Sequence, residues 1–214
     1  MVQKQSDAVM QYKILVTGAT GFVGRILTTH LLAEGRAVCG TLLASESPNF
    51  LVRGAEPVPI EPIGPTTDWN HAFNCIDIVI HLAARVHVMR ECATDSLEEF
   101  RLVNTKGTAN LAREAAKAGV KRFVFMSTIG VNGDNSGNVP FSESSMPNPH
   151  NPYSVSKYEA EQLLQQISLE TGMEVVIIRA PLVYGSGSPG NFFSLLRIVS
   201  KSTPHLFVAT TNRN

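Results

Sequence analysis

The sequence predicts an α/β fold in which helices cover both faces of a doubly wound parallel sheet. Short apolar runs rich in β-branched residues alternate with longer segments of helical periodicity along most of the chain. This alternation is typical of βαβ units, which build parallel sheets. A glycine-rich turn at 17–24 joins the first apolar run to the first helical segment, which is where such folds usually carry one.

The elements follow one another in a regular order. Strands are predicted at Lys13–Thr17, Arg36–Leu43, around Val58, and at Asp77–His81, Lys121–Ser127 and Glu174–Arg179. Helices are predicted at Phe22–Glu34, Ser96–Ala118 and Tyr153–Thr171, each followed by a glycine that can end a helix in the left-handed conformation. Residues 132–152 are crowded with Asn, Ser, Gly and Pro. We therefore expect a long loop there, ending at a helix start formed by Asn151 and Pro152.

Composition disfavours several classes of protein. With 43% hydrophobic and 17% charged residues, the chain is ordinary for a folded globular domain. Lys and Arg together number 18, as do Asp and Glu, and no basic stripe appears, so no nucleic-acid partner is expected. The apolar runs are too short to span a bilayer, so no membrane partner is expected. No group of His, Cys, Asp or Glu has the spacing of a metal site.

The N-terminus and the cysteines suggest where the protein works. Residues 1–11 are polar, lack the apolar core of a signal peptide, and are expected to form a flexible tail. Cys39, Cys75 and Cys92 form neither a CxxC pair nor an even disulfide framework. This pattern suits a reducing compartment, so a cytoplasmic location is expected.

The turn at 17–24 reads Thr-Gly-Ala-Thr-Gly-Phe-Val-Gly between a predicted strand and a predicted helix. In this context, glycines let the backbone approach a pyrophosphate while the helix N-terminus faces its negative charge. The spacing is Gly-x-x-Gly-x-x-Gly, so a plain tight turn is the alternative. An acidic residue about twenty positions further on would favour NAD over NADP. Residues 41–44 contain none and Glu46 lies slightly beyond, so the choice between the two cofactors stays open.

Tyr153 and Lys157 stand four residues apart at the start of a predicted helix and share one of its faces. The lysine ammonium would lower the pKa of the phenol, so that the tyrosine can exchange a proton with a substrate hydroxyl. An accidental surface pair is the alternative. The glycine turn and the segments 81–84, 127–133 and 180–185 all fall at the ends of predicted strands. In a parallel sheet these ends share the ligand-binding edge.

With these motifs the chain resembles the extended short-chain dehydrogenase/reductase family, and within it the bacterial nucleotide-sugar 4-epimerases and related polysaccharide-biosynthesis enzymes. The resemblance covers almost the whole chain. It rests on the motifs at 17–24 and 153–157 together with His-Leu-Ala-Ala at 81–84, Val-Asn-Thr-Lys-Gly-Thr at 103–108, Phe-Val-Phe-Met-Ser-Thr at 123–128 and Arg-Ala-Pro-Leu-Val-Tyr-Gly at 179–185. It implies a Rossmann-type fold with bound NAD, or alternatively NADP.

The resemblance also implies roles for individual residues. Tyr153 is the acid/base, Lys157 holds the ribose hydroxyls, and Thr128 hydrogen-bonds the reacting oxygen, with Ser127 as the alternative for this last role. Cofactor contacts are expected from Gly18, Thr20, Gly21, Phe22, Val23, Gly24, Leu82, Ala83, Ala84, Asn104, Ser127, Tyr153, Lys157 and Pro181. Substrate contacts are expected from Thr128, Tyr153 and Asn191, and His81 is expected to be structural.

Two departures from the family pattern stand out. Glu61 and Pro62 occupy the region where the family usually supplies an aspartate for the adenine. Members of the family also continue for roughly another hundred residues, which form most of a C-terminal lobe. The resemblance therefore implies that 12–214 is the cofactor-binding domain, with a truncated substrate lobe that begins at about 186.

The implied activity is that of a nucleotide-sugar 4-epimerase, an isomerase that oxidises the sugar transiently at C4 with tightly bound NAD. Its substrate would be a UDP-hexose or UDP-N-acetylhexosamine. A reductase or dehydratase of the same family and a non-catalytic dinucleotide sensor are the alternatives. Thr128 is followed by Ile129 and Gly130 rather than by the acidic pair of dehydratases, which disfavours dehydration. The family also implies a homodimer formed through the helices at 96–118 and 153–171.

Overall fold

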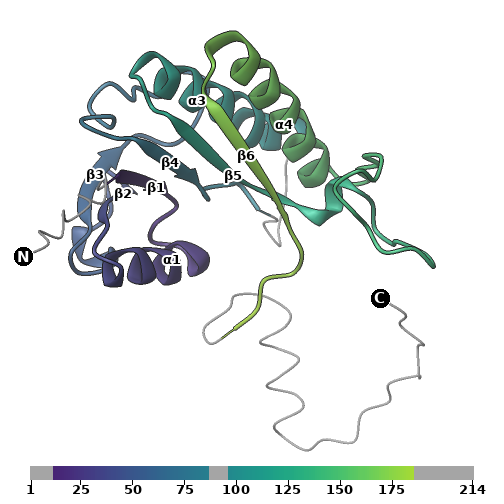
Figure 1. Cartoon of the computed structure of the whole chain (residues 1–214), viewed down its shortest axis with the longest axis horizontal. Coiled ribbons are helices and arrows are strands. Elements are labelled where there is room, and N and C mark those ends of the chain that lie inside the picture. The colour runs from purple at the N-terminus through teal and green to yellow at the C-terminus, as the bar shows by residue number, and fades with distance from the viewer. Residues whose placement is uncertain (1–11, 87–95, 186–214) are drawn as a thin grey trace, which may run out of the picture.

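Six parallel strands form one sheet in the order β3-β2-β1-β4-β5-β6 within the described part of the chain (Figure 1). The structure is a computed structural model that describes residues 12–86 and 96–185. The strands are β1 (Lys13–Thr17), β2 (Ala37–Leu43), β3 (Glu56–Ile60), β4 (Ile78–His81), β5 (Arg122–Thr128) and β6 (Glu174–Ala180). The strand order reverses between β1 and β4, and this switch point is where doubly wound sheets bind ligands. The predicted fold class is confirmed.

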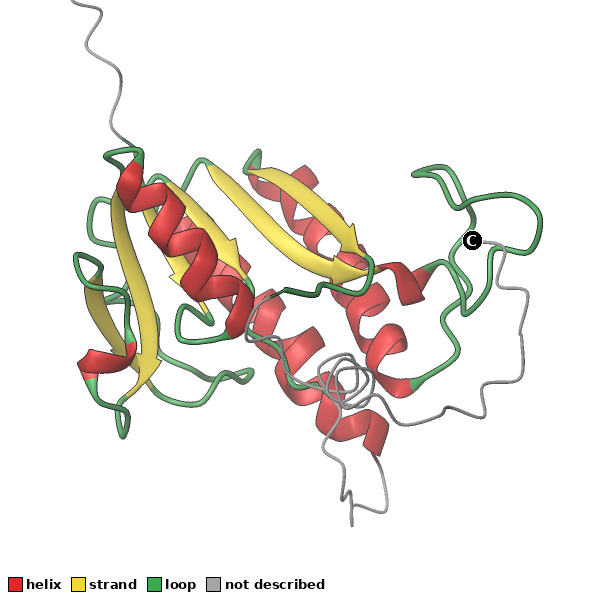
Figure 2. Ribbon diagram, turned by 90° about the horizontal axis from the view of Figure 1, so that it is seen from below, coloured by secondary structure: helices red, strands yellow, loops and turns green. Residues whose placement is uncertain are grey.

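Helices cover both faces of the sheet (Figures 1 and 2). α1 (Phe22–Ala33) lies on one face, and α2 (Ser96–Phe100), α3 (Thr108–Lys117) and α4 (Pro152–Thr171) lie on the other. Successive side chains of a strand point to opposite faces, so β1 contributes to two cores. Leu15 packs in the core beneath α3 and α4, whereas Ile14 and Val16 pack on the α1 side.

The sheet is covered unevenly at its β6 edge. Val175 and Ile177 of β6 pack against the core beneath α3 and α4. Val176 and Ile178, on the other face of the same strand, are 41% and 43% exposed. Among the described residues, the α1 face is therefore well packed at β1 and β2 and open at β6.

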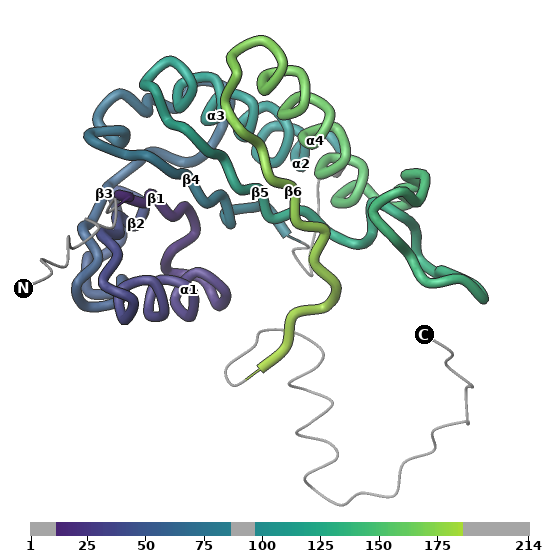
Figure 3. Tube along the Cα trace, viewed as in Figure 1, coloured from purple at the N-terminus to yellow at the C-terminus, as the bar shows by residue number. Residues whose placement is uncertain are grey.

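Most predicted elements are confirmed to within one or two residues, and the helix predicted at 96–118 is present as a continuous helical segment over 96–117. Its middle, η2 (Arg101–Gly107), is π-helical and separates α2 from α3. Such segments often occur at functional sites. Asn104 and Thr105 of η2 both donate to Ser156 of α4, at 3.1 and 2.9 Å. Helical periodicity could not predict these hydrogen bonds to α4. Figure 3 shows that α4 runs beside α2 and α3.

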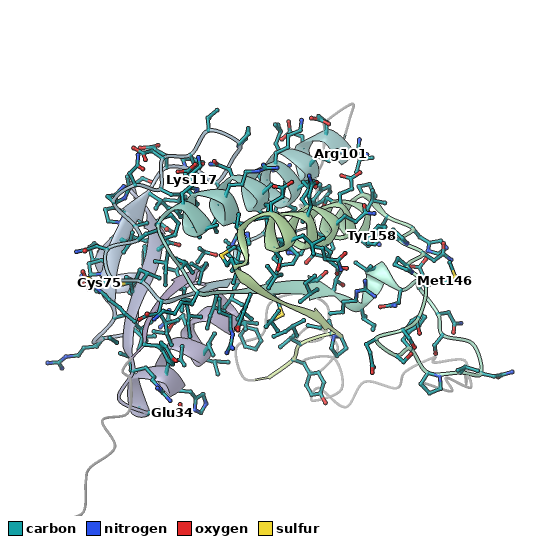
Figure 4. All side chains as sticks on the ribbon, turned by 45° about the horizontal axis from the view of Figure 1, so that its top comes forward. Glu34, Cys75, Arg101, Lys117, Met146 and Tyr158 are labelled. Atoms are coloured by element: carbon teal, nitrogen blue, oxygen red, sulfur yellow. The ribbon has the colours of Figure 1, made fainter. Side chains whose placement is uncertain are left out.

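The polar loop at 132–151 contains neither helix nor strand, as predicted. An unpredicted 3-10 helix, η3 (Ile129–Val131), precedes the loop. Met146, on the outer side of the loop, is 86% exposed (Figure 4). The loop ends at a capping box in which Asn151 and Ser154 satisfy each other's backbone N–H groups. α4 therefore begins at a fixed point, which sets the position of every side chain on its first turns. A second 3-10 helix that was not predicted, η1 (Pro48–Phe50), follows β2.

Gly18 brings the turn after β1 into contact with the segment after β4. Its φ is +68°, and a Cβ at this position would lie 2.8 Å from the backbone nitrogen of Ala83. The Leu82 N–H donates to the carbonyl oxygen of Thr17 at 3.2 Å. Glycine is thus needed both for the left-handed conformation and for the close approach.

His81 lies in the interior at the end of β4, where it is 1% exposed. Its Nδ1 lies 2.6 Å from Thr17 Oγ1 and its Nε2 lies 2.9 Å from Thr108 Oγ1, so both ring nitrogens are engaged. The ring stacks on Phe125 with centroids 5.8 Å apart. Burial, assisted by the charge of Lys157, lowers the pKa of His81 to about 3. The neutral ring joins β1, β4 and α3, in agreement with the structural role expected from the sequence.

We predict that Gly18→Ala destabilises the protein more than Gly35→Ala does. Both positions have a positive φ, +68° and +76°, which costs an alanine about 1–2 kcal/mol. Only the Cβ at position 18 meets backbone atoms, because nothing lies within 4 Å of a Cβ at position 35. The clash should lower the free energy of unfolding by about 1–3 kcal/mol more. Urea denaturation measures both losses, and equal losses would contradict the prediction.

We predict that His81 contributes to acid destabilisation. Its pKa is about 3 in the folded chain against an ordinary value of 6.5, so between these pH values the unfolded chain binds one more proton. The free energy of unfolding should fall as the pH drops from 6.5 to 3, by up to about 1.4 kcal/mol per pH unit. His81→Gln should make the slope shallower by this amount in urea titrations at several pH values. The loss at pH 7.5 measures the cost of the altered hydrogen bonds and of the lost stacking on Phe125, and an unchanged slope would refute the prediction.

Candidate functional site

The glycine turn forms a cradle at the carboxyl edge of β1. The Gly21 N–H donates to the Gly18 carbonyl at 3.0 Å, and a Cβ on Gly24 would lie 2.1 Å from the same oxygen. α1 begins directly after Gly21, which has no side chain to cap it. The N–H groups of Phe22 and Val23 at the start of α1 therefore face the edge of the sheet, where they can bind a phosphate. These residues fit the pyrophosphate of a dinucleotide.

The segment after β4 runs beside this cradle. Leu82, Ala83 and Ala84 are partly buried, and the Ala83 N–H donates to Thr17 Oγ1 at 3.3 Å. These residues therefore lie next to the glycine turn, and their contact with the cofactor stays a prediction. Thr20, within the turn, is also partly buried.

Asn104 ties this segment to α4. Its Oδ1 accepts from the Arg85 N–H at 2.9 Å, and its Nδ2 donates to the Arg85 carbonyl at 3.0 Å. The same Nδ2 donates to Ser156 Oγ. Asn104 is 1% exposed, so its amide holds the backbone in place from within the protein. The cofactor contact expected for Asn104 stays a prediction.

Tyr153 and Lys157 lie on the first two turns of α4, and the Lys157 side chain reaches the sheet at Phe125. Lys157 is 1% exposed, and its Nζ lies 4.0 Å from the centroid of the Phe125 ring, a cation–π distance. Burial lowers the pKa of Lys157 to about 7, although the carboxylate of Glu161 raises it in part. The Tyr153 ring packs edge-on against Phe100, with centroids 6.1 Å apart.

The expected lowering of the Tyr153 pKa is wrong for this structure. Burial of the phenol raises its pKa above the ordinary value. The physical reason is that desolvation disfavours the phenolate, while the Lys157 ammonium lies over Phe125. The tyrosine hydroxyl is therefore protonated at neutral pH in the chain without a bound cofactor.

Thr128 and Ser127 occupy different environments at the end of β5. Thr128 is partly exposed, and its Oγ1 accepts from the Gly130 N–H at 3.2 Å. A Cβ on Gly130 would lie 3.4 Å from Ser154, the residue after Tyr153, so this turn packs against the start of α4. Ser127 is 3% exposed and donates its hydroxyl proton to Glu161. Of the two hydroxyls, the one on Thr128 is better placed to meet a ligand.

A buried polar cluster beneath these residues was missed by sequence reasoning. Arg179 Nη2 donates to Glu161 Oε2 at 2.7 Å, and Arg179 Nη1 donates to Asn132 Oδ1 at 3.3 Å. Glu161 is 1% exposed. It stands four residues beyond Lys157, so the spacing Tyr-x-x-x-Lys-x-x-x-Glu on one helix face is the signal that could have revealed it.

A cavity of about 450 Å³ borders this cluster on the side of the polar loop. It is lined by Ile129, Asn132, Phe141, Ser142, Glu143, Glu161, Gln165, Ile177 and Arg179. Neither the glycine turn nor Tyr153 lines it, so this cavity is distinct from the edge where the predicted site residues meet.

The carboxyl end of β2 carries an acidic group that the local sequence does not place there. Residues 41–44 lack an acid, as noted from the sequence. The chain then turns back, and Glu46 Oε2 accepts from the Leu43 N–H at 2.8 Å. A carboxylate therefore lies at the end of β2 after all. Glu61 of the following segment is exposed.

Some of the predicted site residues and segments lie at the end of the described part of the chain or outside it. Pro181 follows β6 and is exposed. Asn191, the tail at 1–11 and most of the expected lobe from 186 lie outside the described residues. Across 12–86 and 96–185, no helix is long and apolar enough to cross a membrane. In the same ranges, no three His, Cys, Asp or Glu side chains are grouped to hold a metal ion.

Known proteins resemble this chain over most of its length. A UDP-glucose 4-epimerase of Vibrio cholerae is 38% identical over 209 residues, which cover 96% of this chain and 62% of the relative. A dTDP-D-glucose 4,6-dehydratase of Mus musculus is 42% identical over 195 residues, which cover 81% of this chain and 51% of the relative. The chain thus spans between half and two thirds of the length of these relatives.

Solved structures agree with the sequence relatives. The UDP-glucose 4-epimerase of Thermotoga maritima with UDP-glucose matches with a TM-score of 0.69 and 29% identity, over 81% of this chain and 56% of that one. The UDP-glucuronic acid 4-epimerase of Bacillus cereus in complex with NAD matches with a TM-score of 0.67 and 28% identity, over 81% and 57%. The model of the NAD dependent epimerase/dehydratase family matches residues 14–203. The chain belongs to the NAD-dependent epimerase/dehydratase family.

Proposed function

We propose that this chain binds NAD and carries the catalytic residues of a nucleotide-sugar 4-epimerase. One observation carries the proposal: the glycine cradle, Thr128 and the Tyr153–Lys157 pair come from different elements and meet at one edge of the sheet. The two UDP-glucose 4-epimerases among the similar proteins support the choice of activity. Because the chain spans only 62% of the Vibrio relative, the activity of the whole protein is part of the proposal.

The cofactor would lie along the switch point of the sheet. The N–H groups at the start of α1 would hold its pyrophosphate, Leu82–Ala84 would border it, and Lys157 would reach its nicotinamide ribose. When bound, NAD accepts a hydride from the sugar carbinol carbon and returns it. Glu46 is the carboxylate available to the adenosine ribose, because it lies at the end of β2.

Residues of this chain would bind and transfer the proton of the sugar 4-hydroxyl. Thr128 Oγ1 would hydrogen-bond the sugar 4-hydroxyl, and Tyr153 Oη would accept its proton and later return it. Burial alone holds the Tyr153 pKa high, so the tyrosine can act as a base only when positive charge lies near it. Lys157 is the buried cation on the same helix face that can provide this charge. Tyr153 and Lys157 therefore act as one unit.

The rival activities use the same site differently. A reductase of this family would consume reduced cofactor in proportion to product, whereas an epimerase leaves the cofactor unchanged at equilibrium. Absorbance of the reduced nicotinamide separates the two. A dehydratase needs acidic groups next to the catalytic hydroxyl, but Thr128 leads into Ile129 and Gly130 of η3. A sensor would bind the dinucleotide without any sugar turnover.

We predict that Glu46→Gln weakens NAD binding about tenfold, because a hydrogen bond to a charged group contributes about 1.5 kcal/mol or more. Discrimination against NADP should decrease together with it, since the 2′-phosphate would no longer meet a negative charge. Isothermal titration calorimetry with both dinucleotides measures the change. Glu56→Gln is the matched control, because Glu56 pairs with Lys13 at the opposite edge of the sheet. Equal affinities for the wild type and Glu46→Gln would assign the ribose contact elsewhere.

We predict that Tyr153→Phe abolishes interconversion of UDP-glucose and UDP-galactose, since general acid–base catalysis contributes about 10²–10⁴-fold. NAD affinity should fall by no more than about tenfold, since one neutral hydrogen bond contributes about 0.5–1.5 kcal/mol. Proton NMR of the sugar anomeric signals follows the products. The measurement is made on this chain and on a fusion to the C-terminal part of the Vibrio relative. Turnover by the Tyr153→Phe fusion at the wild-type rate, or no turnover by the wild-type fusion, would refute the proposed activity.

A further inference from the structure

The carboxylate of Glu161 joins three elements of the site from within the protein. Glu161 lies one turn beyond Lys157 on α4 and is 1% exposed. Its oxygens accept from Ser127 Oγ on β5 and from Arg179 on β6, the latter through Nη2 at 2.7 Å and Nε at 3.1 Å. One side chain thus fixes the carboxyl ends of two strands relative to the helix that carries Tyr153.

The partners of Glu161 are neighbours of the groups that the proposed reaction uses. Ser127 directly precedes Thr128 on β5, so the bond to Glu161 holds the backbone from which the Thr128 hydroxyl projects. Arg179 also donates to Asn132 at 3.3 Å, which extends the cluster to the start of the polar loop. A shift of Glu161 would therefore move Thr128 relative to α4.

Packing alone does not account for this cluster. The Glu161 side chain is 1% exposed and that of Arg179 is 22% exposed. An ion pair with so little access to water is costly to desolvate and is often no more stabilising than apolar residues of similar size. Its hydrogen bonds must be nearly complete to be tolerated, and those of Glu161 come from two separate partners. Unlike apolar packing, such a cluster fixes the orientation of its side chains and holds a charge at a fixed position.

The titratable and charged groups around Lys157 come from α4, β4 and β6. Glu161 on the same helix raises the pKa of Lys157 against the opposing effect of burial. His81 of β4 lies behind Phe125 and is neutral at the pH of interest. Arg179 lies on the far side of Glu161 and is paired with it. Tyr153, one turn before Lys157, is protonated in the free chain. Among the described residues, Glu161 is therefore the anion that raises the pKa of Lys157.

We propose that Glu161 is a positioning residue for the site: it aligns Thr128 through Ser127 and supports the positive charge of Lys157. The alignment of Thr128 rests on the proposed function, whereas the effect on Lys157 is a property of the chain itself. The two parts can therefore be tested separately.

The first test follows the protonation of Lys157 in the chain without cofactor. Lysine labelled with ¹³C at Cε reports each ammonium by NMR, and Lys157→Met identifies the signal. Glu161→Gln should lower the Lys157 midpoint by about one pH unit, as expected for the loss of a nearby opposite charge. Glu159→Gln is the matched control, because Glu159 lies on the same helix and pairs with Arg101 at 2.6 Å, away from the strand ends. An unchanged midpoint in Glu161→Gln would overturn the proposal.

A second measurement does not depend on the folding of Glu161→Gln, in which Arg179 loses its charged partner. In the wild type with ¹³C-labelled glutamate carboxyl groups, the Glu161 signal should show an inflection at the Lys157 midpoint, because the two charges act on each other. Lys157→Met should remove this inflection. A Glu161 signal that is flat through the Lys157 midpoint would overturn the proposal even if the variant does not fold.

The third test addresses Thr128 and needs sugar turnover. Ser127→Ala keeps the Glu161–Arg179 pair, so it should lower kcat without moving the Lys157 midpoint. Glu161→Gln should lower kcat, by up to about tenfold at pH values above the Lys157 midpoint of the cofactor-bound enzyme, because a drop of one unit in the Lys157 pKa reduces its charged fraction about tenfold above the midpoint. Glu161→Asp, which keeps the charge, should restore the midpoint. An unchanged kcat in Ser127→Ala would overturn the alignment role, whereas no turnover by the wild type would refute the proposed function and leave the Lys157 result standing.

Discussion

The site depends on the way α4 packs along the carboxyl half of β5. Lys157 lies over Phe125 at 4.0 Å, Ser127 bonds to Glu161, and Gly130 lies against Ser154. These contacts bring a helix and a strand that are separated by a twenty-residue polar loop into one register. Because the capping box fixes where α4 begins, a change in that register would displace Tyr153 and Lys157 together. The geometry of the strand edge therefore depends on these contacts between α4 and β5 in the core.

Burial sets the electrostatics of this edge. It lowers the pKa of His81 to about 3 and that of Lys157 to about 7, and it raises that of Tyr153. All three shifts favour the neutral form, as desolvation requires. The free chain therefore holds a protonated phenol and a partly charged lysine.

The paired strands of a parallel sheet explain why so much of the site could be predicted. Glycine spacing, the Tyr153–Lys157 spacing and the polar residues after each strand are local features, and parallel pairing places all strand ends at one edge. The helix predicted at 96–118 contains a feature that local sequence patterns could not predict. In its π-helical middle, Asn104 and Thr105 bond to Ser156, and helical periodicity gives no indication of that contact. Glu46 is a second case, since its return to Leu43 depends on a turn.

By itself, the sequence determined the fold class, the strand order along the chain, the cradle of glycines and the residues able to carry proton transfer. These follow from periodicity, backbone freedom and side-chain chemistry, which each residue brings with it. Only the tertiary structure decided the direction of the Tyr153 pKa shift, the preference for Thr128 over Ser127 as the accessible hydroxyl, and the cluster around Glu161. Each of these depends on burial and on partners distant in the chain, and desolvation in particular exists only once the core has closed.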